Sequence, residues 1–214
     1  DRVADIAAGA PRRLQPWAGL TLADPDAALA EAERCADRGL RGLAMTPFWD
    51  GVDPARPEYA KVFAFAEARG LPVWLHAGHH FAAGRPYDLS HPRTLDILAA
   101  RHPDLVLIAG HGGWPWVLDT VAIAMRHPNV HIDISTHRPG RMAVPGSGWE
   151  PLLCYGRGPL RDRVLFGTAR WAHAVPTGVL VREVLQLGLG DEVAHDWLFG
   201  NAARITGLTG TAGP

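Results

Sequence analysis

Short, almost continuously apolar runs alternate along the chain with longer segments in which apolar positions recur at helical spacing. The run at 105–109, Leu-Val-Leu-Ile-Ala, is typical of the short ones. Parallel strands covered on both faces by helices have this continuous apolar character, whereas half-exposed strands alternate. The pattern predicts buried strands over Gln15–Leu20, Leu40–Thr46, Pro72–His76, Leu105–His111, Asn129–Ser135 and Arg163–Thr168.

Helices are predicted between these strands. The first begins behind Asp24, a residue that caps helix N-termini, with Pro25 in the first turn, and it ends before Gly39. The Gly- and Pro-rich loop at 136–149 is expected to be mobile or to act as a lid. The predicted helices cover Ala27–Asp37, Glu58–Arg69, Pro92–Arg101, Trp116–Arg126, Pro176–Leu187 and Asp191–Ile205.

Repeated strand–helix units predict a parallel α/β sheet with right-handed crossovers. An open doubly wound sheet and a (β/α) TIM-like barrel both satisfy this pattern. No GxGxxG loop follows any predicted strand, which argues against the dinucleotide-binding form of the open sheet. The predicted strands are two fewer than the roughly eight of a TIM barrel. No linker interrupts the chain, so residues 1–214 are predicted to form a single domain.

Composition narrows the possible partners. The net charge is −1, so the chain offers no basic field for nucleic acid or for an anionic membrane. No apolar run approaches the ~18 residues that span a bilayer. Cys35 and Cys154 match no metal or redox spacing and are interpreted as free thiols, which favours a cytoplasmic location. The chain starts at Asp1 rather than Met, so we expect further residues upstream.

Two histidines stand where parallel α/β folds build their sites. His76 and His111 each end a predicted strand, with glycine one or two residues further on. Imidazole binds transition metals and also transfers protons near neutral pH. The alternative is that each is a hydrogen-bonded core or rim histidine. Since a metal site needs about three or four protein ligands, these two alone do not define one.

Other residues are weaker candidates. His79 and His80 follow a strand end and are expected to reach a pocket, as are His137 and the aromatic side chains of Trp114 and Trp171. Asp133 lies deeper in its predicted strand than a typical ligand, so a structural hydrogen bond is the preferred interpretation. The histidines at helix ends are predicted to lie on the surface: His91, His102 and His127.

Six segments occur in an order that resembles the amidohydrolase-related family, the amidohydrolase 2 group. They are GLRGLAMTPFWDG, LPVWLHAG, HPDLVLIAGHGGWPW, PNVHIDIS, DRVLFGTARW and LFGNAARITGL, and they extend over essentially the whole chain. The resemblance implies a distorted TIM barrel. It also implies one of the activities found in this family, which contains metal-dependent hydrolases, decarboxylases of aromatic and related carboxylic acids, and some hydratases and lactonases.

The family's pattern has a His-x-His pair after the first strand, a histidine after the fifth and sixth strands, and an aspartate after the eighth. By resemblance, His76 is the fifth-strand metal ligand. His111 is the sixth-strand histidine, which acts as a ligand or as a proton donor and acceptor. The visible strands then correspond to the third to eighth. Two departures stand out: the chain contains no His-x-His, and Ala169 replaces the eighth-strand aspartate.

The resemblance implies an enzyme acting on a small carboxylic or carbonyl compound with a divalent metal, preferably Zn and otherwise Mn or Fe. His76 would hold the metal and His111 would move a proton, with Arg170 or Arg138 holding an anionic substrate. Another group, such as His79, His137 or His173, would fill the place left by the missing aspartate. A catalytically inactive barrel that binds a small molecule or serves as a structural subunit is the alternative. In a third interpretation, this chain forms an incomplete barrel that is closed by a second copy in a homo-oligomer or by another partner.

Overall fold

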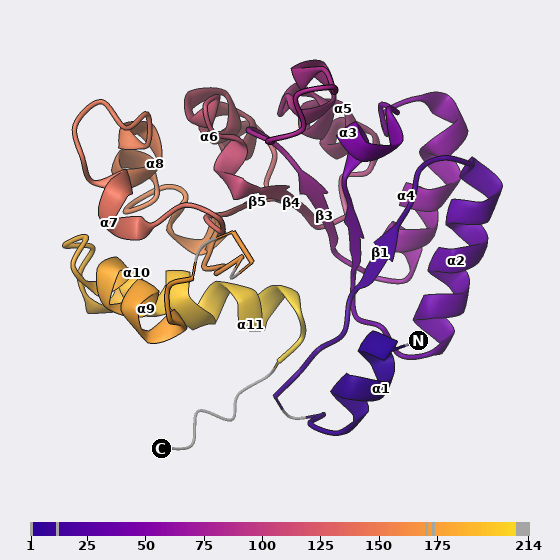
Figure 1. The fold of residues 1–214 in the computed structure, drawn as a ribbon, viewed down its shortest axis with the longest axis horizontal. Helices are drawn as coiled ribbons and strands as arrows, with labels where there is room; N and C mark the ends of the chain where they lie inside the picture. Colours follow the sequence, from indigo (N-terminus) through magenta and orange to yellow (C-terminus); the bar gives the residue numbers. More distant parts are fainter. Residues whose placement is uncertain (1, 12, 170, 173, 209–214) are drawn as a thin grey trace.

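The computed structural model describes residues 2–11, 13–169, 171–172 and 174–208, and contains one parallel sheet (Figure 1). Its six strands follow one another in chain order. Such sequential order is that of a barrel wall, whereas a doubly wound sheet reverses its order. The predicted α/β barrel-like class with six strand units is therefore confirmed. The strands are β1 (Ala18–Leu20), β2 (Leu43–Met45), β3 (Val73–His76), β4 (Leu107–Gly110), β5 (Val130–Asp133) and β6 (Val164–Leu165).

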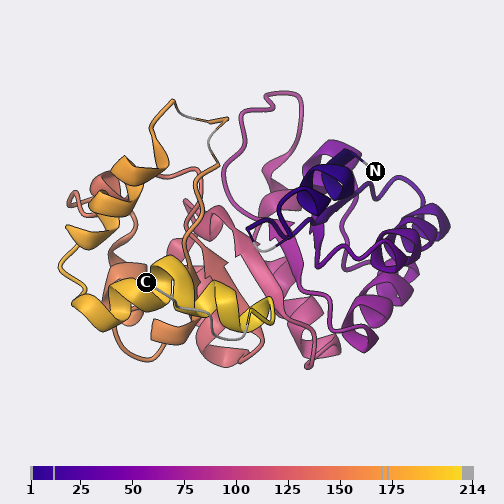
Figure 2. The same cartoon turned by 90° about the horizontal axis from the view of Figure 1, so that it is seen from below.

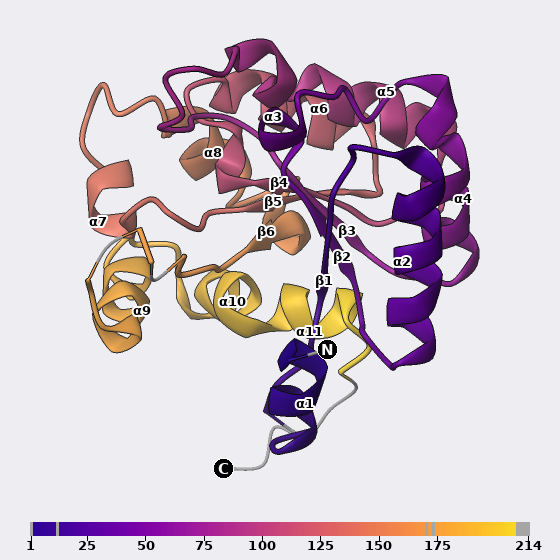
Figure 3. The same ribbon diagram turned by 45° about the vertical axis from the view of Figure 1, so that its right-hand side comes forward.

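Helices α2, α4, α5 and α6 cover the outer face of the curved sheet in chain order (Figures 1 and 3). Helices α9 and α10 lie beyond β6, at the opposite end of the molecule from α2 (Figure 2). The helices are α1 (Arg2–Ala8), α2 (Pro25–Asp37), α3 (Pro47–Asp50), α4 (Ala60–Ala68), α5 (Arg93–Arg101), α6 (Val117–Arg126), α7 (Pro139–Met142), α8 (Glu150–Tyr155), α9 (Thr177–Leu185), α10 (Asp191–His195) and α11 (Asn201–Ile205).

Each predicted strand and helix overlaps an observed one with different ends, and the short helices α3 and α8 were not predicted. All six strands are shorter than predicted, and the predicted helix Asp191–Ile205 is divided by a π-helical turn over Asp196–Gly200. The cap of α2 is as expected, because the Asp24 side chain accepts a hydrogen bond from the backbone N–H of Ala27. The predicted loop at 136–149 contains the short helix α7.

The two faces of the sheet carry different residues, because side chains alternate along each strand. Leu107 and Ile132 on the outer face are fully buried beneath the helices. On the inner face, Trp74, Ile108 and His131 stand in register across β3, β4 and β5. Because side chains alternate along a strand, the inner row continues upward to His76 and Asp133 at the carboxyl ends.

In the described part of the chain, no helix is both long enough and apolar enough to cross a bilayer.

His102 and His127 are not surface residues, and the prediction for them is wrong. Both follow an outer helix, in the repeated sequence Arg-His-Pro, and both are buried. His102 Nδ1 lies 3.1 Å from the carboxylate of Glu67 on α4, and His127 Nε2 lies 2.7 Å from that of Asp96 on α5. Each imidazole therefore ties the end of one helix to the preceding helix. His91 remains partly exposed, as predicted.

Acid should destabilise the protein through His131, whose pKa is lowered from 6.5 to about 4 by burial and then by the charge of Arg163. Between these values the unfolded chain binds a proton that the folded chain does not. The neutral His131 therefore contributes about 3 kcal/mol to the free energy of unfolding above pH 6.5. This contribution is lost as the pH falls toward 4. Urea unfolding of wild type and His131→Leu between pH 7.5 and 4.5 should show a shallower pH dependence in the variant.

His195→Leu is the matched control, because the side chain of His195 is largely exposed. It should retain a steeper pH dependence of the unfolding free energy than His131→Leu. Identical slopes for wild type and His131→Leu would contradict the assignment.

Candidate functional site

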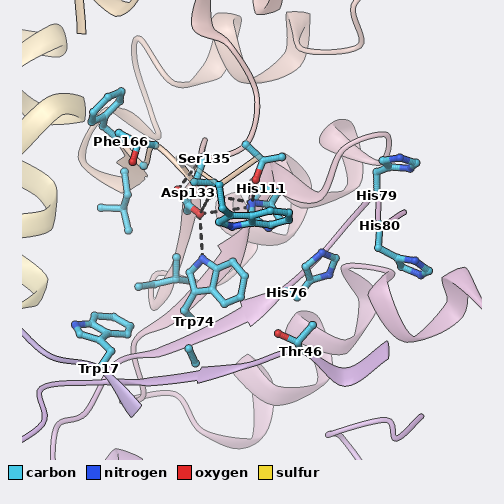
Figure 4. A pocket seen from close by; sticks show the side chains of 18 of the residues that line it. Trp17, Thr46, Trp74, His76, His79, His80, His111, Asp133, Ser135 and Phe166 are labelled. Carbon is cyan, nitrogen blue, oxygen red and sulfur yellow. Dashed lines mark hydrogen bonds between the residues drawn. The ribbon is translucent and has the colours of Figure 1, made fainter. Parts of the chain in front are cut away.

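A cavity of about 720 Å³ opens at the carboxyl ends of the strands (Figure 4). Part of its polar lining comes from the inner face of the sheet and from the residues that directly follow the strands: Thr46, His76, His111, Asp133, Ser135 and Thr136. The described lining residues include no lysine or arginine, and Asp133 is their only carboxylate. The cavity is thus an apolar hollow with a polar row along one wall.

His76 and His111 face each other across this wall. His76 is the last residue of β3, and His111 directly follows β4. Their ring centroids are 5.0 Å apart and the ring planes make an angle of 76°. The structure thus places the two strand-end imidazoles next to each other, and their roles as metal ligand and proton carrier stay predictions.

Both imidazoles are held neutral near pH 7. The pKa of His76 falls to about 3, first because burial penalises its charged form and second because a charged His111 would repel it. Burial also lowers the pKa of His111, while the negative charge of Asp133 acts in the opposite direction. A neutral imidazole has one nitrogen with a free lone pair, which is the form that accepts a proton or binds a cation.

Asp133 makes the structural hydrogen bonds that the sequence suggested, and it also lines the cavity. Its carboxylate accepts hydrogen bonds from Trp74 Nε1 at 3.0 Å and from the Ser135 hydroxyl at 2.5 Å. The same hydroxyl oxygen lies 2.8 Å from His111 Nδ1. The strand was predicted to continue to Ser135, but β5 ends at Asp133, so its carboxylate lies at the rim and not below it. The inner-face periodicity was the available signal.

Two glycines make room for this network. A Cβ atom at Gly110 would lie 2.3 Å from the Trp74 indole. A Cβ atom at Gly167 would lie 2.4 Å from Oδ1 of Asp133 and 2.6 Å from Cβ of Ser135. Atoms at these separations overlap, so the close approach of the neighbouring strands requires glycine at both positions.

The other predicted pocket residues divide into two groups. His79, His80 and Trp171 line the cavity, and the buried His80 ring stacks on Phe48 at a centroid distance of 4.1 Å. Trp114 and His137 are not among the described lining residues. They pack against each other outside it, with ring centroids 5.5 Å apart, and burial lowers the pKa of His137 to about 4.

Of the two predicted anion-binding arginines, only Arg138 lies among the described residues. Arg138 is ion-paired with Glu183 of α9 and is absent from the described lining residues. Arg170 and His173 lie outside the described residues.

An aromatic rim around the cavity was largely missed at the sequence level. Phe81 and Trp171 are 80% and 81% exposed, and Trp49 is 59% exposed, yet all three line the cavity. They follow β3, β6 and β2 respectively. Large apolar side chains left this exposed at the mouth of a cavity are typical of a ligand-binding rim. The missed signal was an aromatic residue shortly after each of three strand ends.

The described residues do not fit a complete metal centre. They contain no group of three or more His, Cys, Asp or Glu side chains positioned to hold an ion. Nδ1 of His111 is engaged by hydroxyl groups of Ser135 and Thr136, which leaves one nitrogen on that ring. Ala169 lines the cavity where the family's aspartate was expected, and its methyl group cannot bind a cation. His76 and His111 thus supply two ligands where about three are needed.

Taken together, the geometry is that of a (β/α) barrel with imidazoles and a carboxylate at its strand ends. The chain belongs to the amidohydrolase family, whose Amidohydro_2 model matches residues 1–208. No curated protein sequence matches the chain.

Solved structures show the same fold. An uncharacterised TIM-barrel protein from Bordetella bronchiseptica is 25% identical with a TM-score of 0.85, over 96% of this chain and 71% of that one. A 2,6-dihydroxybenzoate decarboxylase from Rhizobium is 22% identical with a TM-score of 0.73, over 98% and 76%. A dihydroxybenzoic acid decarboxylase from Polaromonas, solved with bound manganese, is 17% identical with a TM-score of 0.73, over 99% and 74%.

Restoring the family's carboxylate should create a metal site. Ala169 has φ +39°, in the left-handed region that Asp and Asn adopt more readily than alanine, so Ala169→Asp should fold normally. A third ligand beside His76 and His111 should raise the affinity for Zn²⁺ at least about tenfold, measured by isothermal titration calorimetry.

Ala169→Asn is the matched control, since it suits the same backbone but carries no charge. It should bind Zn²⁺ much more weakly than Ala169→Asp. Equal Zn²⁺ affinities for wild type and Ala169→Asp would show that position 169 does not face the two imidazoles.

Proposed function

We propose that this chain is a hydrolase or decarboxylase of a small carboxylic or carbonyl compound and that the cavity is its active site. The observation that supports this most is the facing pair of neutral imidazoles, His76 and His111, at adjacent strand ends inside a cavity of about 720 Å³. Reactive groups of TIM-barrel enzymes lie at this end of the strands.

His111 is the proposed proton-transfer residue. Its Nδ1 is held by hydroxyl groups, so Nε2 is the nitrogen left for a bound molecule. In hydrolysis, Nε2 would take a proton from the water that attacks the carbonyl carbon. In decarboxylation, Nε2 would take the proton of the substrate's carboxylic acid group and deliver it to the carbon that loses CO₂. Such general acid–base catalysis contributes about 10²–10⁴-fold to a rate.

The family likeness extends the proposal to a divalent metal, with Zn as the first expectation and Mn or Fe as alternatives. His76 and His111 are the described residues that would contact it, but His111 would do so through Nε2, the nitrogen of its proposed proton transfer, so metal binding and proton transfer exclude each other at His111. Because they amount to only two ligands, no step proposed for His111 depends on the metal. Among the solved structures, the Polaromonas decarboxylase is described with manganese.

The lining favours a flat, largely apolar substrate. Phe48, Trp74 and Phe166 line the cavity together with the exposed rim residues Phe81 and Trp171. Aromatic side chains stack on planar rings and gain about 0.5–1.5 kcal/mol per pair beyond the burial of area. We therefore propose a small aromatic carbonyl or carboxylic compound.

A second candidate function is ligand binding without catalysis. It is favoured by Ala169, which offers no group for metal binding or proton transfer at the position where the family has aspartate. In this case the cavity would hold a similar compound and release it unchanged.

Replacing His111 should separate these two functions. Wild-type protein is incubated with a panel of aromatic carboxylic acids, lactones and amides, and CO₂ release and hydrolysis are followed. If the proposal holds, His111→Gln lowers kcat about 10²–10⁴-fold, because the proton-transfer group is lost. His76→Gln also lowers the rate, whereas the control His91→Gln, outside the cavity, leaves it unchanged.

Ligand binding is followed in parallel by tryptophan fluorescence. A compound that quenches the fluorescence of wild type and His111→Gln equally, with no turnover of any compound by the wild type, would contradict catalysis and favour the binding function.

We also propose that a second copy or another chain closes the barrel. In the described residues β1 pairs only with β2, so its other edge has no strand partner. The outer edge of β6 also lacks a strand partner but is covered, because Val164 O accepts a hydrogen bond from Asn201 Nδ2 and Phe166 N–H donates one to Trp197 O. Exposed strand edges readily pair with another chain. Light scattering coupled to size exclusion should show a dimer or larger assembly of the purified chain, or a stable complex with a partner when one is co-purified. A monomer at tens of micromolar with no co-purifying partner would contradict this.

A further inference from the structure

We infer that Asp133 acts through Ser135 as a positioning residue that holds His111 in the tautomer with the proton on Nδ1. The lone pair is then on Nε2, the nitrogen left for a bound molecule. The tautomer is a property of the fold, and only its catalytic consequence rests on the proposed function. The inference gives Asp133 a role in the chemistry of the site.

The direction of each hydrogen bond follows from Asp133. Its carboxylate is 7% exposed and, when ionised, can only accept hydrogen bonds. Oδ1 accepts the backbone N–H of Ser135 at 2.8 Å, and Oδ2 accepts Trp74 Nε1–H at 3.0 Å. The Ser135 hydroxyl lies 2.5 Å from Oδ2, so its single proton is donated to the carboxylate.

The Ser135 oxygen therefore presents only lone pairs to His111 Nδ1, at 2.8 Å. A hydrogen bond forms at this distance only if Nδ1 carries the proton. The other tautomer would place two lone pairs against each other inside a buried site. Thr136 Oγ1, 2.9 Å from the same nitrogen, accepts equally well from Nδ1–H and so does not oppose this assignment. The Nε2–H tautomer would lose the buried hydrogen bond to Ser135. The free-energy cost of that loss corresponds to at least about a tenfold excess of the Nδ1–H tautomer over the Nε2–H tautomer.

The backbone is strained at both ends of the His111–Thr136 contact. His111 has φ +59° and Thr136 has φ +71°, and a β-branched residue rarely adopts such values. Strained conformations of this kind persist where surrounding contacts enforce them, and they cluster at active sites. The tight fit of Gly167 against Asp133 and Ser135 leaves the carboxylate little freedom to turn away. The hydrogen-bonded chain is thus fixed from several sides.

The consequence for catalysis is a defined proton path. A neutral His111 accepts a proton at Nε2 from water or substrate, which forms an imidazolium with Nδ1–H still directed at Ser135. The Asp133 charge stabilises this cation through the serine. When Nε2 gives the proton back, the ring returns to its starting tautomer, so no proton is gained or lost over the cycle.

Nitrogen NMR tests the tautomer directly, without any substrate. Protein labelled with ¹⁵N in histidine is measured at pH 8, where neutral rings report which nitrogen carries hydrogen, and His111→Gln identifies the His111 signals by their loss. In wild type, Nδ1 should have the shift of a protonated ring nitrogen and Nε2 that of a bare one.

Two variants then break the chain at different links. In Asp133→Asn the side-chain amide can donate to Ser135, which frees the serine proton for Nδ1, so the His111 tautomer should change to Nε2–H. In Ser135→Ala the link is absent and the tenfold excess of Nδ1–H should fall toward a mixture. Trp74→Phe is the matched control, because it removes another hydrogen bond to Asp133 but leaves the serine link. It should keep the wild-type tautomer.

An Nε2–H tautomer in wild type, or an unchanged Nδ1–H excess in both folded variants, would overturn the inference. Trp74→Phe changing the tautomer as Asp133→Asn does would also overturn it, since the effect would then be one of general packing. With a turned-over substrate in hand, Asp133→Asn should lower kcat about 10²-fold and change KM little. The NMR spectrum of the wild type could show the Nδ1–H tautomer while His111→Gln keeps full activity. That result would refute the proposed function but not the tautomer assignment.

Discussion

Parallel strands in chain order must all end at the same rim of the sheet, and the whole site depends on this constraint. It brings together residues from distant parts of the chain: His76 after one crossover, His111 after the next and Asp133 after a third. The crossover helices cover only the outer face, so the inner face is free for groups that helices could not pack against. A hydrogen-bonded row of polar residues then lies along the inner rim of an otherwise apolar wall.

Burial at that rim decides the charge of the site. An imidazolium inside an apolar hollow is costly, so His76 and His111 are neutral, and a buried carboxylate is tolerated only because N–H and O–H groups surround it. The carboxylate and the imidazole do not touch through their side chains but are connected by one hydroxyl group. This arrangement stabilises a proton on His111 when one arrives, without holding the resting ring in its charged form.

The sequence was informative wherever one periodicity dominated. Continuous apolar runs located all six strands, and the strand-end histidines located the site, because both depend on local pattern alone. The structural hydrogen bonds expected of Asp133 are present, but its place in the cavity wall was not foreseen, because strand ends are set by pairing with neighbouring strands. His102 and His127 were misplaced for a related reason: their carboxylate partners lie on other helices, 35 and 31 residues away. Trp114 and His137 pack on each other by tertiary contacts that no local pattern contains.

At Ala169 the backbone conformation and the side chain favour different residues. Its left-handed conformation is a poor one for alanine and a better one for aspartate or asparagine. An alanine codon that ends in T or C differs from an aspartate codon by a single base, and the backbone at this position already accommodates either residue. A barrel of this kind can gain or lose an acidic group in one genetic step, and its chemistry is therefore more easily changed in evolution than its fold.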